Sequence, residues 1–244
     1  MTVFPSNTFV TWPERGSPVS VSTWLREVGG FVRASAAPLQ FPEDAARGHD
    51  EPVIVVPGFC SPDISTAHLR GFLTRQGFAV RSWDCGLNLG PANDVLERLE
   101  GRVRESAERH AHKVSLVGVS LGGTLAREAA KRCPDCVERV VTLASPINLP
   151  VATPLAPVAR LVSVLWDKDA QDAIGRIRQA PPVPVTAVVS PGDGVIDWHA
   201  CIPETSSLVE LVMIAGAHMT MGSNPDAQRI VAARLASPTS GFGY

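Results

Sequence analysis

Residues 113–133 read KVSLVGVSLGGTLAREAAKRC, and this stretch decides the fold class. Its first part, residues 113–120, is a short apolar run rich in valine, which is typical of a buried strand. Its second part, residues 121–133, is rich in alanine and leucine, which favours a helix. A strand that passes into a helix through a glycine-rich turn indicates a unit of a parallel α/β fold.

The same alternation of strand and helix continues on both sides of this stretch. Further strands are predicted at 52–58, 78–84, 137–146, 183–193 and 207–218. Helices are predicted at 22–36, 63–77, 93–112 and 225–237. This alternation predicts a mostly parallel sheet with helices on both faces. Because ligands of such sheets bind at the carboxyl ends of the strands, we expect the chemistry at that edge.

The composition limits the class of protein. The chain has 244 residues, of which 45% are apolar and 19% are charged, which favours one large globular domain. Its 22 basic and 24 acidic side chains leave a net charge of −2, which argues against nucleic-acid binding. The five cysteines are too few for a disulfide scaffold and fit a reducing compartment.

No targeting or membrane signal is recognisable in the sequence. The N-terminal residues lack a basic segment followed by an apolar run, so they do not resemble a signal peptide. The longest stretch without a formal charge, residues 140–159, contains four prolines, which argue against a transmembrane helix. We therefore expect a soluble, cytoplasmic protein without integral membrane association.

The turn inside the opening stretch carries a candidate nucleophile. Residues 118–122 read GVSLG, a G-x-S-x-G pattern with the serine at Ser120, and Gly123 follows. A strand before the serine and a helix after it are the setting of a nucleophile elbow. The flanking glycines allow neighbouring backbone to approach closely, and the turn raises the serine Oγ above the sheet at the helix N-terminus. We therefore predict that Ser120 is a nucleophile.

A serine nucleophile needs a base and an acid that orients the base. His218 follows the last predicted strand, at the expected edge, and is favoured over His199 as the base. Asp193 and Asp197 both follow the strand predicted at 183–189. Asp193 is favoured because it is nearer the strand end and is flanked by glycines. Asp197 remains the alternative acid, although it is also suited to capping a short helix.

Acyl transfer also requires backbone N–H donors for the oxyanion of the intermediate. The first is expected from Leu121, the residue after the nucleophile. The second is expected from the loop after the first core strand, where we favour Phe59 and keep Cys60 as the alternative.

Four motifs give the chain a family resemblance. They are PGFCS (57–61), GVSLGG (118–123), SPGDGVID (190–197) and GAHMTMGSNP (216–225). On these motifs the chain resembles the α/β-hydrolase superfamily, specifically its small bacterial lipases and carboxylesterases. The chain order of serine, aspartate and histidine also matches that superfamily. The resemblance implies a Ser120–Asp193–His218 triad, an acyl-enzyme mechanism, and neither cofactor nor metal.

The chain departs from the family pattern at two places. Many members have histidine where this chain has Pro57, and many have proline where it has Asp197. Neither departure removes a predicted catalytic group.

The predicted domain organisation is a hydrolase core with an arm and an insertion. The core comprises residues 52–146 and 183–244, and residues 1–51 form an N-terminal arm and helix that pack on it. Residues 147–182 are expected to form a small helical cap. Three pocket residues are predicted to line the site of an apolar acyl group: Val162, Trp166 and Met219.

The sequence as a whole predicts a hydrolase of small-molecule carboxylic esters. Two alternatives use the same residues or the same fold. One is a thioesterase or amidase with the same triad, and the other is a non-catalytic ligand-binding protein with the α/β-hydrolase fold.

Overall fold

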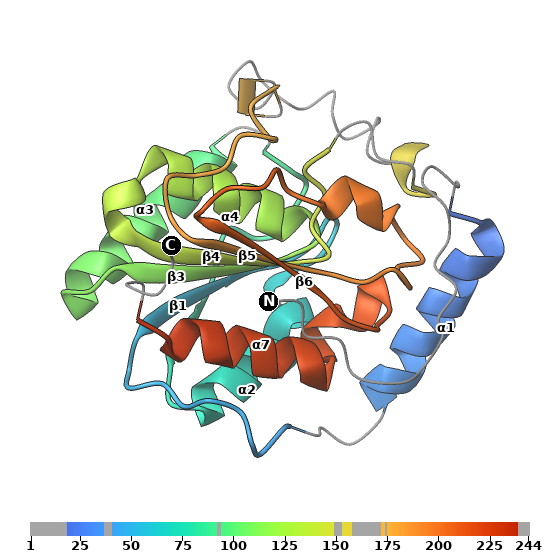
Figure 1. The fold of residues 1–244 in the computed structure, drawn as a ribbon, viewed down its shortest axis with the longest axis horizontal. Helices are drawn as coiled ribbons and strands as arrows, with labels where there is room; N and C mark the ends of the chain where they lie inside the picture. Colours follow the sequence, from blue (N-terminus) through green and yellow to red (C-terminus); the bar gives the residue numbers. More distant parts are fainter. Residues whose placement is uncertain are drawn as a thin grey trace.

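The computed structural model describes residues 19–36, 41–91, 94–148, 153–157, 172–173 and 175–238. Six parallel strands in these residues form one sheet, in the order β2-β1-β3-β4-β5-β6 (Figure 1). The strands are β1 (Pro52–Val56), β2 (Ala79–Ser82), β3 (Val114–Val119), β4 (Val137–Leu143), β5 (Val185–Val189) and β6 (Val209–Met213). The predicted parallel sheet is therefore confirmed.

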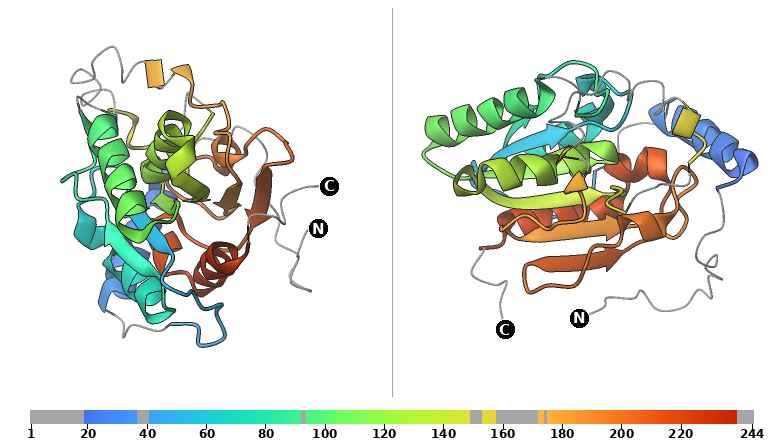
Figure 2. Two further views of the ribbon diagram at one scale, coloured as in Figure 1. Left: turned by 90° about the vertical axis from the view of Figure 1, so that its left-hand side faces the viewer. Right: turned by 90° about the horizontal axis from the view of Figure 1, so that it is seen from above.

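Helices cover both faces of this sheet, as predicted (Figures 1 and 2). They are α1 (Val21–Ala36), α2 (Ala67–Arg75), α3 (Val95–His110), α4 (Leu121–Arg132) and α7 (Pro225–Ala236). Helices α3 and α4 lie on one face, and α2 and α7 lie on the other. Helix α1 lies at one end of the sheet, in contact with the short helix η4 (His218–Ser223).

Strand β1 shows why the sheet is buried on both faces. Its side chains alternate: Ile54 and Val56 pack in the cluster with α3 and α4, whereas Val53 and Val55 pack in the cluster with α2 and α7. All four side chains are essentially inaccessible to solvent. A run of β-branched residues without polar alternation is what a strand covered on both faces requires.

Three elements differ from their predicted bounds: one helix begins as a separate 3-10 helix, and two strands end earlier than predicted. The helix predicted at 63–77 begins as the 3-10 helix η1 (Asp63–Thr66), where the Ser65 and Thr66 hydroxyls donate to carbonyls three residues back. The strand predicted at 137–146 ends before Ala144, whose φ of 48° turns the chain out of the sheet. The strand predicted at 207–218 ends at Met213, so a loop carries the chain to His218.

The strand order places the site at a topological switch point. The chain moves from β1 to β2 on one side and then returns to place β3 on the other side of β1. Val56 of β1 pairs with Gly118 of β3, so the loops that follow these strands run side by side. Crevices at such points are the usual ligand sites of open α/β sheets.

The predicted cap is described only in part. Within residues 147–182, Leu155 packs against the cluster of Val189, Val195 and Ile196, and Ala173 packs in the α3–α4 cluster. Val162 and Trp166 lie outside the described residues. The cap and these two pocket residues therefore remain predictions. Among the helices that the structure describes, none is long and apolar enough to cross a membrane.

Candidate active site

Ser120 occupies a strained turn between β3 and α4. Its backbone has φ 52° and ψ −129°. Residues other than glycine rarely adopt this conformation, which costs about 1–3 kcal/mol. The turn is held at both sides, because the Ser120 N–H donates to the Leu143 carbonyl and the Ser120 carbonyl accepts from the Gly123 N–H, at 2.8 and 2.9 Å. The surrounding structure therefore imposes the conformation that raises the serine side chain above the sheet.

The glycines of the elbow are required by close backbone contacts. A methyl group on Gly118 would come within 2.3 Å of the Gly123 Cα. One on Gly122 would come within 2.3 Å of the Val56 carbonyl oxygen and 2.4 Å of the Pro57 carbonyl oxygen. These distances explain the G-x-S-x-G pattern in physical terms, since only glycine permits the helix to approach β1 and the strand to approach the helix.

Gly122→Ala is expected to destabilise the protein by about 2 kcal/mol or more, because backbone atoms that cannot move aside obstruct the new methyl group. The measurement is the free energy of unfolding in urea. Gly101→Ala is the matched control: Gly101 lies in α3, is exposed, and has no atom within 4 Å of the new methyl group. That change should stabilise the protein by up to about 1 kcal/mol. Equal stabilities for the two variants would refute the packing explanation.

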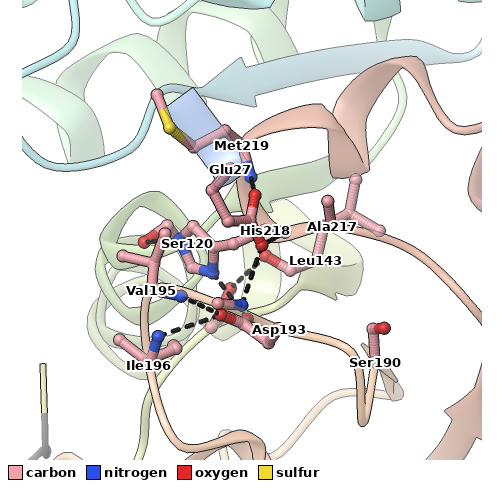
Figure 3. A network of polar contacts seen from close by, with 12 residues as sticks. Glu27, Ser120, Leu143, Ser190, Asp193, Val195, Ile196, Ala217, His218 and Met219 are labelled. Atoms are coloured by element: carbon pink, nitrogen blue, oxygen red, sulfur yellow. Dashed lines mark hydrogen bonds and ion pairs between the residues drawn. The ribbon is translucent and has the colours of Figure 1, made fainter. Parts of the chain in front are cut away.

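The structure brings Ser120, His218 and Asp193 together at the carboxyl ends of β3, β6 and β5 (Figure 3). The His218 Nε2 lies 2.9 Å from the Ser120 Oγ, and the His218 Nδ1 lies 2.6 Å from the Asp193 Oδ2. This arrangement is one continuous chain of hydrogen bonds from carboxylate to imidazole to hydroxyl. Its geometry is that of a nucleophile, a base and an acid that orients the base.

The two candidate acids occupy different environments. The Asp193 side chain is 1% exposed, and its Oδ1 accepts hydrogen bonds from the Val195 and Ile196 N–H groups, both at 2.9 Å. Asp197 caps the 3-10 helix η3 (Trp198–Cys201), where its Oδ1 accepts from the His199 N–H at 3.0 Å and lies 2.7 Å from the His199 Nδ1. Asp193 therefore faces His218, while Asp197 and His199 pair with each other.

Comparison with known proteins now identifies the family. A family model described as the PGAP1-like alpha/beta domain matches residues 93–226, which is more than half of the chain and includes all three of these side chains. The chain belongs to the PGAP1-like α/β domain family. It is thus a member of the α/β-hydrolase superfamily, as the motifs predicted. None of the curated protein sequences matches the chain.

Solved structures share the fold of this chain. A thermostable carboxylesterase cloned from a metagenomic library is 13% identical, with a TM-score of 0.61 over 95% of this chain and 100% of that chain. Lipase B of Aspergillus fumigatus is 18% identical, with a TM-score of 0.59 over 82% of this chain and 56% of the lipase. A monoacylglycerol lipase of Paleococcus ferrophilus is 15% identical, with a TM-score of 0.57 over 77% of this chain and 96% of the lipase. This chain thus spans little more than half of the length of the fungal lipase.

The electrostatic setting of His218 favours its role as a base. Burial lowers the pKa of its imidazole, but the charge and hydrogen bond of Asp193 and the charge of Glu27 outweigh burial and raise the pKa above its usual value. The imidazole is therefore well suited to accept a proton. Because a base must be neutral before it acts, proton uptake by His218 at lower pH removes this capacity.

The loop after β1 lies against Ser120 and is fixed by Asn88. A methyl group on Gly58 would lie 3.3 Å from the Ser120 Cβ. The buried Asn88 accepts the Cys60 N–H at its carbonyl oxygen, at 2.7 Å, and donates from its Nδ2 to the Pro57 carbonyl, at 2.6 Å. The Cys60 amide is thereby occupied. By contrast, the described part of the chain provides no acceptor for the Phe59 amide, which favours Phe59 as the second oxyanion donor.

Sequence reasoning missed two side chains that hold this site. Asn88 is one, and no local pattern in the segment after β2 distinguished it. Glu27 of α1 is the other: its carboxylate accepts hydrogen bonds from the N–H groups of Gly194, His218 and Met219. Glu27 is the single acidic residue of the predicted helix 22–36, and no other feature of the sequence pointed to it.

Met219, the third predicted pocket residue, directly follows His218 in the sequence. Its side chain is 37% exposed. Within the described ranges, no three His, Cys, Asp or Glu side chains gather in a way that would hold a metal ion.

Proposed function

We propose that this protein is a serine hydrolase that cleaves carboxylic esters through Ser120, His218 and Asp193. The observation that carries this proposal is the hydrogen-bonded chain from the Asp193 carboxylate through His218 to the Ser120 hydroxyl, with distances of 2.6 and 2.9 Å. The lipases and carboxylesterases that share the fold support the same class of reaction.

In the first half-reaction the Ser120 Oγ attacks the carbonyl carbon of the ester while the His218 Nε2 takes the hydroxyl proton. The carbonyl oxygen becomes an oxyanion, which the Phe59 and Leu121 N–H groups stabilise. The bond from carbon to the leaving oxygen then breaks, and His218 returns its proton to the departing alcohol. The product at this stage is an acyl ester of Ser120.

In the second half-reaction His218 removes a proton from water, and the resulting nucleophile attacks the acyl carbon. Collapse of this second oxyanion breaks the bond to the Ser120 Oγ, which regains its proton from His218, and the carboxylic acid leaves. Asp193 remains ionised throughout, because its role is to fix the imidazole tautomer and to stabilise the imidazolium. Its two backbone N–H bonds and its burial suit that role.

A matched series of substrates tests this proposal. The acyl group is varied from acetate through butyrate and octanoate to palmitate as p-nitrophenyl esters, and the butyryl group is also offered as a thioester and an anilide. We expect ester hydrolysis with a preference for short or medium acyl chains over long ones, and its loss in His218→Asn. A preference for the thioester or anilide would replace the ester assignment. Binding of these compounds without acylation of Ser120 and without turnover would indicate the non-catalytic alternative.

A further inference from the structure

Glu27 is a buried carboxylate that the proposed reaction does not use. It lies on α1 and is 5% exposed, although it is far from the triad in sequence. Its Oε1 accepts the Gly194 and His218 N–H groups at 2.8 Å each, and its Oε2 accepts the Met219 N–H at 3.1 Å. Gly194 follows the proposed acid, and His218 is the proposed base. One carboxylate therefore joins the two loops that carry Asp193 and His218 (Figure 3).

We infer that Glu27 is a positioning residue that fixes the acid loop and the histidine loop relative to each other, so that Asp193 and His218 meet in reactive geometry. This inference rests on the proposed function. The inference also gives helix α1 a defined role in catalysis, although the helix contributes no group to the reaction.

Helix α1 packs tightly against the acid loop at Gly194. A methyl group on Gly194 would come within 2.6 Å of the Glu27 Cγ and 2.8 Å of the Thr23 Cγ2. The glycine therefore lets α1 approach the acid loop until the carboxylate reaches its backbone N–H. Trp24, three residues before Glu27 on the same helix, packs with Val195 and Ile196 of that loop. The helix and the loop thus meet through both apolar and polar contacts.

A carboxylate suits this position better than any neutral side chain. Three N–H donors converge on it, and an ionised carboxylate only accepts hydrogen bonds. A glutamine has the same shape, but its NH₂ group would face one of those donors. Among the residues that the structure describes, no Lys or Arg forms an ion pair with Glu27. Its charge is therefore balanced by backbone dipoles and acts on the neighbouring imidazole.

The electrostatic consequence is a measurable signature. The ionisable groups that raise the pKa of His218 are Asp193 on the loop after β5 and Glu27 on α1, and burial opposes both. Removing the Glu27 charge should lower the pKa of His218, because the imidazolium loses one of two nearby negative charges. A substitution that only lowered the stability of the fold, without removing a charge near His218, would leave this pKa unchanged.

The test compares Glu27→Gln with Arg26→Gln, which changes a charge at the adjacent exposed position of the same helix. The pKa of His218 is measured by NMR titration of its ring, and kcat and KM for p-nitrophenyl butyrate are measured across pH. In Glu27→Gln we expect the pKa of His218 to fall, because one of the two nearby negative charges is removed. We expect kcat to fall by about 10- to 100-fold while KM changes by less than about threefold. Arg26→Gln should match the wild type in all three quantities.

Gly194→Ala separates position from charge, because it retains the carboxylate but obstructs its approach to the acid loop. A loss of kcat is expected in this variant when it is measured at a temperature well below the melting temperatures of both the variant and the wild type. If Glu27→Gln, folded by circular dichroism, keeps both the pKa of His218 and kcat of the wild type, the inference is wrong. The NMR titration needs no substrate. An inactive wild type would therefore reject the proposed function, while the effect of Glu27 on His218 would still be decided.

Discussion

Replacing Ser120 with alanine is expected to lower kcat for ester hydrolysis by about 10⁴-fold or more while the fold survives. In the proposed mechanism the hydroxyl is the attacking group, and its only contact in the relay is the bond to His218. Alanine can occupy the same strained turn, which the Leu143 carbonyl and the Gly123 N–H hold. The measurement is kcat for p-nitrophenyl butyrate, together with circular dichroism and the melting temperature.

The control for this prediction is Ser145→Ala, a second serine at the end of a strand. Ser145 is buried and bonds only to backbone carbonyls, the nearer being that of Leu143 at 3.2 Å. Its loss should cost stability but leave most of the activity. A well-folded Ser120→Ala protein that retained activity within about tenfold of the wild type would exclude Ser120 as the nucleophile.

Asp193→Asn is expected to cost about 10⁴-fold in kcat/KM, whereas Asp197→Asn should cost less than about tenfold. An asparagine at 193 can still accept the Val195 and Ile196 N–H groups, so the loop should keep its shape. Its NH₂ group, however, would force the Nδ1 of His218 to become an acceptor and leave a proton on Nε2, where the base must be free. Asp197 bonds to His199 instead.

The measurement is kcat/KM for Asp193→Asn and for Asp197→Asn, with the free energy of unfolding of each variant as a check on stability. If Asp197→Asn were the more damaging change, Asp197 would be the acid in the active form, and the loop after β5 would have to rearrange for catalysis.

The residues that sequence reasoning located lie where strands end. Ser120, Asp193 and His218 follow β3, β5 and β6, and parallel strands bring their carboxyl ends to one edge. A local pattern identified each of them: the glycine elbow, the glycine-flanked aspartate and the histidine after the last strand. The parallel sheet was predictable for a separate reason, because strands and helices alternate along the sequence.

The residues that sequence reasoning missed act across the fold. The helical pattern predicted α1, but not which of its faces would be buried. Leu25 and Val32 are 57% and 61% exposed, whereas Glu27 is buried, so the acidic residue lies inside and two apolar residues lie outside. Asn88 fixes the loop after β1 through contacts 28 and 31 residues distant, Cys60 and Pro57. Such partners depend on how loops meet in space, which no local pattern encodes.

The central claim, that Ser120 is an activated nucleophile, is tested most directly by covalent labelling with a fluorophosphonate. The reagent phosphonylates a serine only where a base removes the proton of its hydroxyl. Mass spectrometry of the intact protein and of its peptides gives the number of labels and their position. The account predicts one label per chain, on Ser120, and none in His218→Asn. A folded wild-type protein that takes up no label, or takes it up at another residue, would contradict the account.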